Sequence, residues 1–506
     1  MSKLNLFIVI LFAISLFLYT FKLEQISSGF HGDEAELSLF SVKIVNHQIT
    51  TIIGVGQHNH PILSFLPQAL SFLIFGISML AARLPSALFS AFSIPIFYFF
   101  IKYLFNRRVA IFSSIFFMFS HLWIAMSRLA INNSQVVFFE LIAFYLLFLS
   151  LKTKRTIFFA LLGISLSMTF YLYAGFRVIP LIILLIVLKE IIFSKTRLNL
   201  IFKFFLSALF FLIFSLPQIN FYLKYPYTFT SREDSIFIFS KTGEGSQWRK
   251  NNYGQLNVPG ILFEQAKKTF MLESRDTSGQ YGSSILLDHI TWVLLLFGII
   301  ITLRYAYKTK YLFLLFWFFL TLIIGNLLTI DPFFLPRATG ALPALFILVG
   351  IAIDVILKLA KKFSNKLFLI SYIIICFMSV IMVLFNLKVY FAYSESNMFG
   401  DPNKYAATKI AKYLQAQDYS YNVIFLTSPM LHADFAPIRF LSPKTKAVDI
   451  ENPENYRPII MAKTIFIIYP IYKNKLDELR IINPNGITIQ EKDIKNQIQY
   501  FIYKTY

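Results

Sequence analysis

Long apolar runs, separated by short polar segments, fill about the first three quarters of the chain. After a first run at 4–21 and a polar stretch at 22–60, a second apolar segment occupies 61–80. Further apolar segments lie at 84–105, 109–126, 135–151, 156–174, 178–194, 200–220, 286–303, 311–329, 338–357 and 367–388. A helix of about 18 or more apolar residues crosses the roughly 30 Å hydrocarbon core of a bilayer. The pattern therefore predicts an α-helical, polytopic membrane protein.

Clusters of Lys and Arg occupy every second loop from position 106 onward. They lie at 106–108, 152–155, 195–203, 304–310 and 358–366. Because cytoplasmic loops collect Lys and Arg, all five should face the cytoplasm. With a cytoplasmic N-terminus this requires that 61–80 lies in the interface or dips into the membrane and returns, which its Pro67 and Gly76 permit. This topology has about eleven spans and an extracytoplasmic C-terminus. In the alternative topology 61–80 spans the bilayer and the N-terminus starts outside.

The composition agrees with a membrane protein. Hydrophobic residues make up 57% of the chain and charged residues only 14%, whereas soluble globular proteins carry roughly 25% charged residues. In a soluble protein the net charge of +21 would suggest a nucleic-acid partner. Here the basic cytoplasmic loops explain it, and no nucleic acid is expected. The single cysteine, Cys376, lies in an apolar run and can form no internal disulfide.

The composition turns polar from about residue 390. Helical spacing of apolar residues at 401–417 and β-type patterns at 422–428, 463–472 and 497–506 predict a small α/β domain. We therefore expect two units, a transmembrane domain at 1–389 and an extracytoplasmic α/β domain at 390–506. The transmembrane domain contains a first outer loop at 22–82 and a long outer loop at 221–285.

Acidic side chains are concentrated just after the first apolar run, in "HGDEAE" at 31–36. Asp33 and Glu34 head a stretch in which Leu37 and Phe40 fall on one helix face, so this stretch could lie in the interface as a short helix. In a purely structural interpretation, Asp33 caps this helix and Glu34 favours its positive end. The acidic pair alone does not distinguish a structural role from a functional one.

Two histidines, His58 and His60, precede the second apolar segment in "HNHP". In an extended chain they share one side, but no further ligand spacing accompanies them. Solvated interfacial histidines are therefore favoured over a metal site.

Four arginines stand at the ends of predicted spans, opposite the basic loops: Arg83, Arg128, Arg177 and Arg337. A single arginine at a helix end often extends toward lipid head groups. As a set these four are unusual, because the positive-inside rule places basic residues on the other side. A guanidinium stays charged and forms bidentate pairs with phosphate. Several of them converging beside a carboxylate would suit a lipid-phosphate or diphosphate substrate.

The ordered motifs "HGDEAE", "HNHPIL", "AARLPSAL", "SRLAINN", "YLYAGFRVIP" and "LPRATGALP", set in this hydropathy profile, resemble the GT-C membrane glycosyltransferases over about residues 1–390. The pattern is most similar to glycosyltransferase family 39, which includes protein O-mannosyltransferases and aminoarabinose transferases of lipid A. The resemblance implies that Asp33 is the catalytic acid/base, with Glu34 beside it, and that the first outer loop forms helices on the membrane. It also implies a sugar donor carried on a polyprenyl phosphate and inverting transfer at the outer face.

The chain departs from the family pattern at two positions. The family often has a lysine where this chain reads "NHP", so the resemblance implies that His60 replaces a phosphate-binding lysine. An aspartate common in the second outer loop is Asn133 here. This leaves open whether a divalent cation takes part, and no metal ligand is predicted.

We therefore predict an inverting glycosyltransferase of the cell membrane in which Asp33 accepts a proton from the acceptor. The candidate ligands of the donor phosphate are Arg128, Arg83, Arg337, Arg177 and His60. Glu34 would hold sugar hydroxyls or orient one of these arginines. The further candidate substrate-binding residues are Asn133, His58 and, in the long outer loop, Asp276 and Tyr281. The acceptor is a protein, a lipid or a cell-surface polymer.

Two other functions fit the hydropathy profile: a lipid-linked sugar polymerase or ligase, and a multi-pass transporter or flippase of lipid-linked saccharides. A transporter should place ionisable residues near the membrane midplane and often shows repeated halves. The sequence has no internal repeat, and Glu140 and Asp354 lie nearer the ends of their predicted spans. The unusual polar residues lie at one predicted surface instead, which favours the glycosyltransferase.

Overall fold

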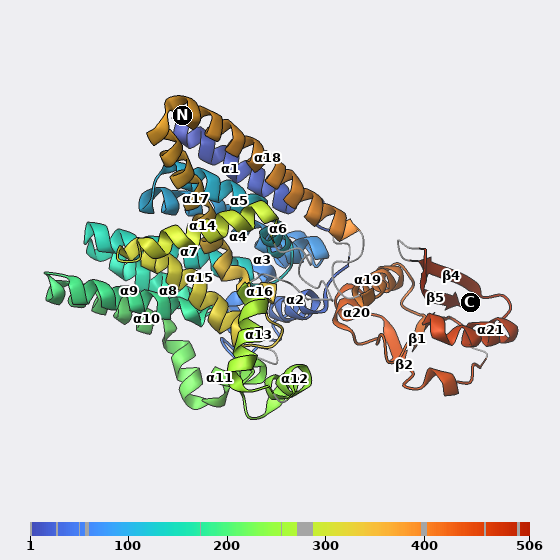
Figure 1. Ribbon diagram of the computed structural model, residues 1–506. Helices are drawn as coiled ribbons and strands as arrows, with labels where there is room; N and C mark the ends of the chain where they lie inside the picture. The colour runs from blue at the N-terminus through green and yellow to red at the C-terminus, as the bar shows by residue number, and fades with distance from the viewer. Residues whose placement is uncertain are drawn as a thin grey trace.

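The computed structural model describes residues 3–26, 29–49, 51–55, 60–172, 174–254, 256–270, 287–395, 402–459, 462–492 and 496–506. A helical body, residues 3–395, is followed by a smaller C-terminal domain, residues 402–506, which is built on a sheet (Figure 1). The predicted fold class, a helical membrane protein with a small C-terminal α/β domain, is confirmed.

The apolar runs of the sequence form the helices of the body. These helices are α1 (Lys3–Thr20), α4 (Met79–Leu104), α5 (Arg107–Phe119), α6 (His121–Ser127), α7 (Asn133–Thr153), α8 (Thr156–Phe170), α9 (Val178–Phe193), α10 (Arg197–Lys224), α14 (His289–Arg304), α15 (Thr309–Leu322), α17 (Leu342–Phe363) and α18 (Asn365–Glu395). Among the described residues, six helices are long and apolar enough to cross a membrane, or seven if the bent pair α5–α6 is one span. Four further apolar helices are shorter.

The segment 61–80 forms no helix of spanning length. Its helix α3 (Leu66–Phe75) has ten residues, about 15 Å at 1.5 Å per residue. The helix ends at Gly76, whose φ of 78° is readily adopted only by glycine. The topology that keeps 61–80 from crossing the bilayer therefore agrees with the length of α3.

Two predicted boundaries differ from the structure. The predicted span 109–126 is broken, because α5 and α6 meet at 61°. The backbone N–H of His121, at the start of α6, donates to Asn386 Oδ1 of α18 at 3.1 Å, which fixes the bend. Helix α18 also continues past the predicted domain boundary at 389 to Glu395, and its Tyr390 is buried in the body.

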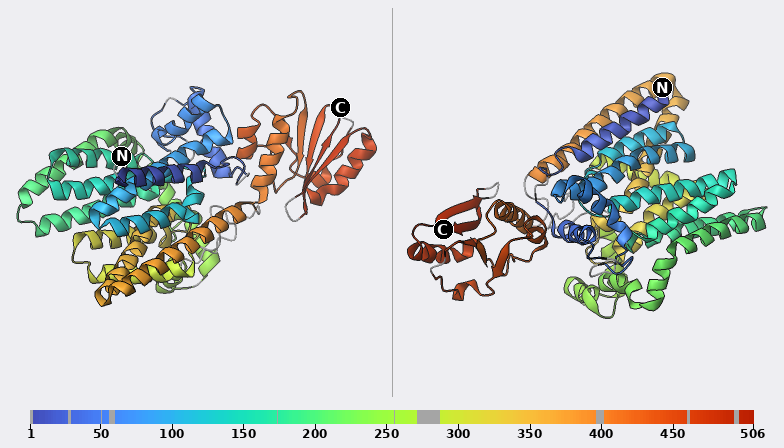
Figure 2. Two further views of the ribbon diagram at one scale, coloured as in Figure 1. Left: turned by 90° about the horizontal axis from the view of Figure 1, so that it is seen from above. Right: turned by 180° about the vertical axis from the view of Figure 1, so that it is seen from behind.

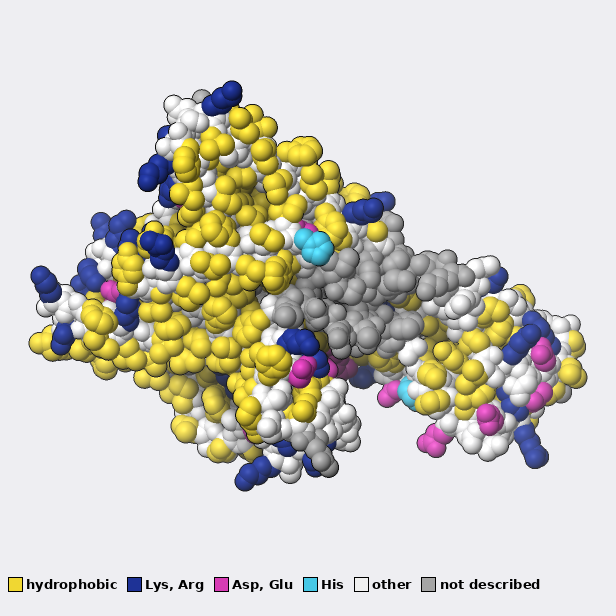
Figure 3. Space-filling view, viewed as in Figure 1, with side chains coloured by type: hydrophobic (Ala, Val, Ile, Leu, Met, Phe, Trp, Pro, Cys, Tyr) yellow, Lys and Arg dark blue, Asp and Glu magenta, His cyan; other side chains and the backbone are white. Residues whose placement is uncertain are grey.

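The five basic loops contact one another at one end of the body, which we call the basic end. Asp354 forms ion pairs with Arg108 (Oδ1–Nε, 2.8 Å) and with Lys358 (Oδ2–Nζ, 2.6 Å), which joins two of these loops. The other contacts are Lys310 Nζ–Leu104 O, 3.1 Å, Lys203 Nζ–Lys154 O, 2.7 Å, and Lys189 Nζ–Tyr307 O, 3.1 Å. Figure 3 shows Lys and Arg along this rim, away from the C-terminal domain. The alternation of charge along the sequence thus corresponds to two ends of one bundle.

The loops between the basic ones meet at the opposite end, which we call the cavity end. The first of them carries α2 (Gly32–Val45), the short helix η1 (Ile62–Ser64) and α3. The long loop carries α11 (Tyr227–Ile236), α12 (Gly243–Tyr253) and α13 (Val258–Phe270). The remaining short elements here are η2 (Ala174–Arg177), η3 (Ile323–Leu327), α16 (Leu335–Ala338) and η4 (Thr339–Ala341).

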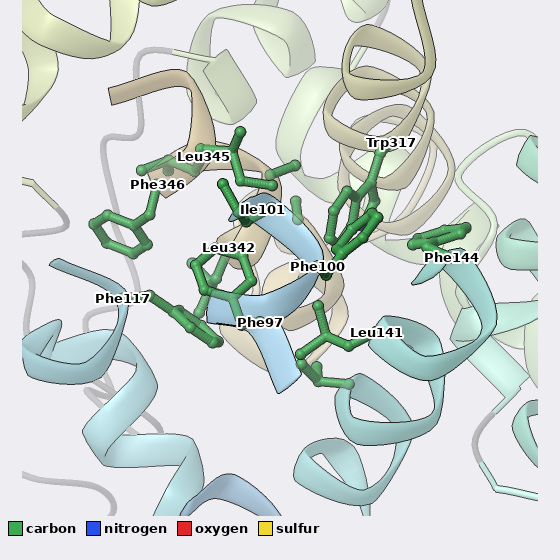
Figure 4. Packing of buried hydrophobic residues seen from close by; sticks show 14 of the residues in the cluster. Phe97, Phe100, Ile101, Phe117, Leu141, Phe144, Trp317, Leu342, Leu345 and Phe346 are labelled. Carbon is green, nitrogen blue, oxygen red and sulfur yellow. The ribbon is translucent and has the colours of Figure 1, made fainter. Parts of the chain in front are cut away.

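Aromatic side chains fill the centre of the body. The indole of Trp317 on α15 packs between Phe100 of α4 and Phe144 of α7, with ring centroids 6.4 and 4.8 Å away (Figure 4). Elsewhere helices approach closely where side chains are small. A Cβ at Gly163 of α8 would lie 2.2 Å from the carbonyl oxygen of Ser207 on α10, so glycine allows these helices to touch.

The C-terminal domain contains a five-stranded sheet of order β2-β1-β3-β5-β4. Its strands are β1 (Asn422–Leu426), β2 (Lys446–Asp449), β3 (Thr464–Ile468), β4 (Ile487–Lys492) and β5 (Ile498–Lys504). Its helices are α19 (Pro402–Gln415), α20 (Ala436–Leu441) and α21 (Lys473–Ile482), with short turns η5 (Pro453–Asn455) and η6 (Pro470–Tyr472). Strands β1, β2 and β3 are parallel, β5 is antiparallel to β3, and β4 is antiparallel to β5. The predicted helix and three strands are α19, β1, β3 and β5. Helices α19 and α20 lie between the sheet and the body, with α20 against α2 (Figures 1 and 2).

Candidate active site at the cavity end

The acidic motif at 31–36 forms the start of α2. His31 is the N-cap: its Nδ1 accepts from the N–H of Asp33 at 3.1 Å. The backbone N–H of His31 donates to Glu34 Oε2 at 3.0 Å, which completes a capping box. The expectation that Asp33 caps this helix is therefore wrong. The cap is His31, two residues earlier, and the Asp33 carboxylate lies 4.0 Å from the Nδ1 of that histidine.

Glu34 and Arg83 form a buried ion pair between α2 and α4. Arg83 Nε donates to Glu34 Oε1 at 2.8 Å and Nη2 donates to Oε2 at 3.0 Å, and both side chains are fully buried. The N–H of Ala130 donates to Oε1 at 2.8 Å. Burial alone would raise the pKa of Glu34, but the charge of Arg83 and these hydrogen bonds outweigh it and hold the pKa below its ordinary 4.5.

The pair also fixes the chain that leads into α2. Arg83 Nη1 donates to the carbonyl of Leu23 at 3.1 Å, and Nη2 donates to that of Gly29 at 2.9 Å. Both charges are therefore used within the protein. Of the two roles expected for Glu34, orientation of an arginine matches this geometry, and contact with a sugar hydroxyl does not.

Asp33 points the other way. Successive side chains on a helix are separated by about 100°, so the residue next to an inward-facing Glu34 can face outward. The Asp33 side chain is 66% exposed and lines a cavity of about 250 Å³. Within four residues the chain thus supplies the helix cap (His31), the exposed carboxylate (Asp33) and the acidic partner of the buried ion pair (Glu34).

Loops that are distant in sequence form the cavity wall. The first loop supplies Asp33 and His60, and the start of α7 supplies Asn133. Arg177 follows α8, and Arg232 lies on α11 of the long loop. The cavity wall thus carries carboxylates on α2 and α11, the guanidinium groups of Arg177 and Arg232, and the imidazole of His60.

Arg177 is held firmly on the cavity wall. Its Nη1 donates to Glu233 Oε1 at 2.8 Å and its Nη2 to the hydroxyl of Tyr222 at 3.2 Å. The guanidinium also stacks 4.3 Å from the ring centroid of Phe229. It retains 23% side-chain exposure, so part of it faces the cavity.

Arg232 was not singled out among the candidates from the sequence. Its guanidinium is half-buried on the cavity wall, and within the described part of the chain no side chain or carbonyl pairs with it. The available signal was "SRED" at 231–234, a basic residue in a loop on the side opposite the basic clusters.

Arg128 and Arg337 do not line the cavity. Arg128 is 1% exposed; its Nε donates to the Tyr390 hydroxyl at 3.0 Å and its Nη1 to the carbonyls of Leu18 and Tyr19 at 3.0 and 3.2 Å. Arg337 is 7% exposed, and its Nη2 donates to the carbonyl of Ile330 at 2.7 Å. Together with Arg83, these arginines join loops and helix ends within the protein.

Asn133 lies on the cavity wall as the first residue of α7. Its Nδ2 donates to the carbonyl of Pro336 at 2.6 Å, so it also holds the loop that carries Arg337. The backbone of His60 pairs with that of Val55 in both directions, at 2.8 and 3.0 Å, which closes a hairpin stem. His58, Asp276 and Tyr281 lie outside the described residues.

A second, apolar groove adjoins the cavity. It has a volume of about 530 Å³ and lies between α3, α4, α7 and α8, and Leu172 lines both spaces. Of the described residues that line the groove, Gln135 alone is polar. An apolar space thus lies next to the polar cavity, along α3.

Metal ligation was left open by the sequence. Among the described residues, no group of three or more His, Cys, Asp or Glu is arranged to hold a metal ion. Of the carboxylates on the cavity wall, Glu36 and Glu233 pair with Arg439 and Arg177.

Comparison with known proteins supports the predicted class. Residues 59–220 match the family model described as dolichyl-phosphate-mannose-protein mannosyltransferase. No match is found among curated protein sequences. Among solved structures, ArnT from Cupriavidus metallidurans in the apo state has 11% identity and a TM-score of 0.59, covering 99% of this chain and 98% of ArnT.

Two further structures have the same fold. ArnT from Cupriavidus metallidurans bound to undecaprenyl phosphate has 12% identity and a TM-score of 0.55, with 98% of this chain and 97% of that chain covered. The archaeal oligosaccharyltransferase AglB from Archaeoglobus fulgidus, in complex with an inhibitory peptide and a dolichol-phosphate, has 13% identity and a TM-score of 0.53, with 99% and 74% covered. The predicted resemblance to the GT-C glycosyltransferases is therefore confirmed in the fold and, over residues 59–220, in the sequence.

Proposed function

We propose that the protein transfers a sugar from a polyprenyl-phosphate donor to a hydroxyl or amine of an acceptor, with Asp33 as the general base. One observation carries the proposal: the exposed carboxylate of Asp33 shares a cavity with His60, Arg177 and Arg232. A glycosyl transfer from a lipid phosphate needs a proton acceptor on one side and fixed positive charge on the other. The GT-C fold and the family match at 59–220 support the same reaction class.

The cationic side of the cavity suits the leaving group. Arg177 and Arg232 keep their charge at any physiological pH. Glu233 and Tyr222 orient Arg177, and part of its guanidinium stays exposed to the cavity. We assign the donor phosphate to Arg177, Arg232 and His60. The sequence also suggested Arg83, Arg128 and Arg337 as phosphate ligands. In this proposal they have a structural role instead, because they are buried and donate hydrogen bonds to acceptors within the protein.

The apolar groove suits the lipid part of the donor. An isoprenoid chain presents only apolar surface, and Gln135 is the one polar residue among the described residues that line the groove. Packing of apolar side chains against the chain would hold it there. Because Leu172 lines both spaces, a phosphate in the cavity could continue directly into a chain lying between α3 and α8. ArnT bound to undecaprenyl phosphate and AglB in complex with a dolichol-phosphate have the same fold.

The reaction balances as a single displacement. The acceptor oxygen or nitrogen attacks the anomeric carbon of the sugar, on the face opposite the phosphate, so the configuration inverts. The bond from this carbon to the phosphate oxygen breaks, and polyprenyl phosphate leaves with the electron pair. The acceptor proton passes to the Asp33 carboxylate. Asn133, on the cavity wall, is positioned to bind sugar hydroxyls.

We further propose that the cavity end faces the outside of the cell membrane, because the basic loops gather at the other end. AglB from Archaeoglobus fulgidus has been solved tethered to an acceptor peptide containing the NVT sequon. For this chain the acceptor class is open among protein, lipid and cell-surface polymer, and each presents the hydroxyl or amine that the reaction needs.

Replacement of the proposed base tests the function. In membranes supplied with polyprenyl-phosphate-linked hexose or pentose donors, Asp33→Asn should lower sugar transfer by at least about 100-fold, since a general base contributes roughly 10²- to 10⁴-fold. Asp234→Asn is the matched control, because Asp234 is exposed on α11 and does not line the cavity. Transfer by Asp33→Asn at the rate of this control, at equal protein level, would refute the assignment.

A further inference from the structure

The C-terminal domain packs directly against the segment that carries Asp33. Helix α20 lies beside α2 (Figures 1 and 2). Helix α19 contacts Gly29 and Phe30, the residues just before α2. One hydrophobic cluster contains Phe30 and Ala35 from this segment and Phe440 and Ile410 from the C-terminal domain. From these contacts we propose that the C-terminal domain is a positioning element for the proposed base: α19 and α20 hold residues 29–36, so that Asp33 faces the cavity. This inference rests on the proposed function.

A buried hydrogen bond joins α19 to the segment. The backbone N–H of Phe30 donates to Thr408 Oγ1 at 2.8 Å, and this hydroxyl in turn donates to the carbonyl of Lys404 at 2.6 Å. Phe30 and Thr408 are buried, at 0% and 2% exposure. A buried backbone donor left without an acceptor is strongly unfavourable. The hydroxyl of Thr408 therefore fixes the chain three residues before Asp33.

Two glycines allow the C-terminal domain to approach this closely. A Cβ at Gly29 would lie 2.9 Å from the Lys404 side chain. A Cβ at Gly32, the residue before Asp33, would lie 3.2 Å from the ring of Phe435. The backbone on both sides of His31 is thus in contact with the C-terminal domain.

An aromatic contact couples the same region to α3. Phe440 of α20 lies 5.1 Å from Phe30 and 5.8 Å from Phe72 of α3, measured between ring centroids. At the edge of the interface, Arg439 pairs with Glu36 at 3.7 Å. The segment 29–36 is therefore held on one side by Arg83, through Glu34, and on the other side by α19 and α20.

This arrangement divides the motif "FHGDEAE" among three partners. Glu34 faces the helical body, Phe30 and Glu36 face the C-terminal domain, and Asp33 faces the cavity. A small displacement of a reacting group can lower a rate by about 100-fold. A loosened contact with the C-terminal domain should therefore lower the rate of the chemical step and leave donor binding intact, because none of the proposed phosphate ligands is in that domain.

The test compares two single hydrogen bonds in the C-terminal domain of the full-length protein. Thr408→Val keeps the side-chain shape but removes the acceptor for the Phe30 N–H, and Thr408→Ser keeps the hydroxyl. Tyr472→Phe is the matched control, because it removes the Tyr472 hydroxyl, which donates to the carbonyl of Ser428 at 2.8 Å, away from α2. Transfer kinetics and hydrogen–deuterium exchange of residues 29–36 are measured for all three.

We expect Thr408→Val to lower kcat by roughly 10- to 100-fold with an unchanged KM for the donor, and to accelerate amide exchange at 29–36. Thr408→Ser should restore both quantities, and Tyr472→Phe should change neither. Equal exchange at 29–36 in Thr408→Val and Tyr472→Phe, or a wild-type kcat in Thr408→Val, would overturn the inference. If the wild type transfers no sugar from these donors, the proposed function is refuted. Accelerated exchange at 29–36 in Thr408→Val would then still support the structural part of the inference, that α19 and α20 fix this segment.

Discussion

Arg232 differs from the other arginines at the cavity end in what surrounds its charge. Arg83, Arg128 and Arg337 donate to carboxylate, hydroxyl or carbonyl groups inside the protein. Arg232 lines the cavity without such an acceptor in the described part of the chain. A phosphate diester offers the charge and the paired oxygens that a guanidinium binds best.

At the residue scale, we therefore predict that Arg232→Ala weakens use of the donor. Loss of a hydrogen bond to a charged group costs about 1.5–3 kcal/mol, roughly 10- to 100-fold in kcat/KM for the polyprenyl-phosphate donor. Arg232→Lys should recover part of this loss, because it keeps the charge but not the bidentate geometry. Steady-state transfer assays in detergent measure both effects.

Arg249→Ala is the control for a general loss of positive charge from the long loop. Arg249 lies on α12, stacks over Phe239 at 5.9 Å and does not line the cavity. If Arg249→Ala lowered kcat/KM as much as Arg232→Ala does, a diffuse electrostatic effect would explain both, and the specific phosphate contact would be refuted.

At the scale of elements, the Glu34–Arg83 pair joins α2 to α4 and makes that joint sensitive to pH. Because the folded pKa of Glu34 is depressed, its stabilising contribution is complete above the ordinary value of 4.5 and is lost as the pH falls through the lower folded value. At pH 7 the pair is therefore fully ionised. Loss of the carboxylate would leave the buried Arg83 charge without its partner.

We predict that Glu34→Gln destabilises the protein at pH 7 by about 3–5 kcal/mol, the cost of removing one partner of a buried ion pair. Thermal unfolding in detergent micelles measures this. The difference in Tm from the wild type should shrink as the pH falls from 4.5 through the lower folded pKa of Glu34, because protonation removes the charge that distinguishes the wild type from the variant.

Glu36→Gln provides the comparison two positions along the same helix. Glu36 pairs with Arg439 while both side chains are more than 40% exposed, and exposed pairs contribute about 0–1 kcal/mol. A Tm of Glu34→Gln equal to that of Glu36→Gln at pH 7 would contradict the bracing role of the buried pair.

The sequence predicted the elements better than it predicted their contacts. Apolar length predicted the long helices of the body, but not α11, α12 and α13 of the long loop, and the alternation of basic loops identified the two ends. Strands β2 and β4 were missed because they lie at the sheet edges and are half exposed, without a clear apolar signal. The bend between α5 and α6 depends on a contact with Asn386, which is distant in sequence.

For the site, the sequence identified Asp33, His60, Asn133 and Arg177, which the fold brings to one cavity. It could not separate ligand-binding arginines from buried braces. Arg83 and Arg177 both stand at helix ends beside apolar residues. Only their tertiary contacts show that Arg83 is buried in an ion pair with Glu34, whereas Arg177 is partly exposed to the cavity. Arg232 was missed because it lies on a helix of the long loop, where the motif pattern gave no guide.

At the scale of the whole molecule, the two ends of the bundle imply an orientation in the membrane. The contacts that gather the five basic loops at one end leave the cavity and the C-terminal domain at the other. Since basic loops remain in the cytoplasm, the C-terminal domain should be accessible from outside the cell. A polyprenyl-phosphate donor would then present its sugar to acceptors on that side.

Cysteine labelling checks this orientation, because the chain has one native cysteine, which Cys376→Ser removes. In that background, Asn474→Cys on α21 should react with a membrane-impermeant maleimide in intact cells. Lys195→Cys, in the basic loop before α10, should react only after permeabilisation. Both positions are exposed in the structure, so a difference between them reports the side of the membrane. The opposite pattern would place Asp33 on the cytoplasmic side, where nucleotide sugars compete as donors, and would remove the topological reason for a lipid-linked substrate.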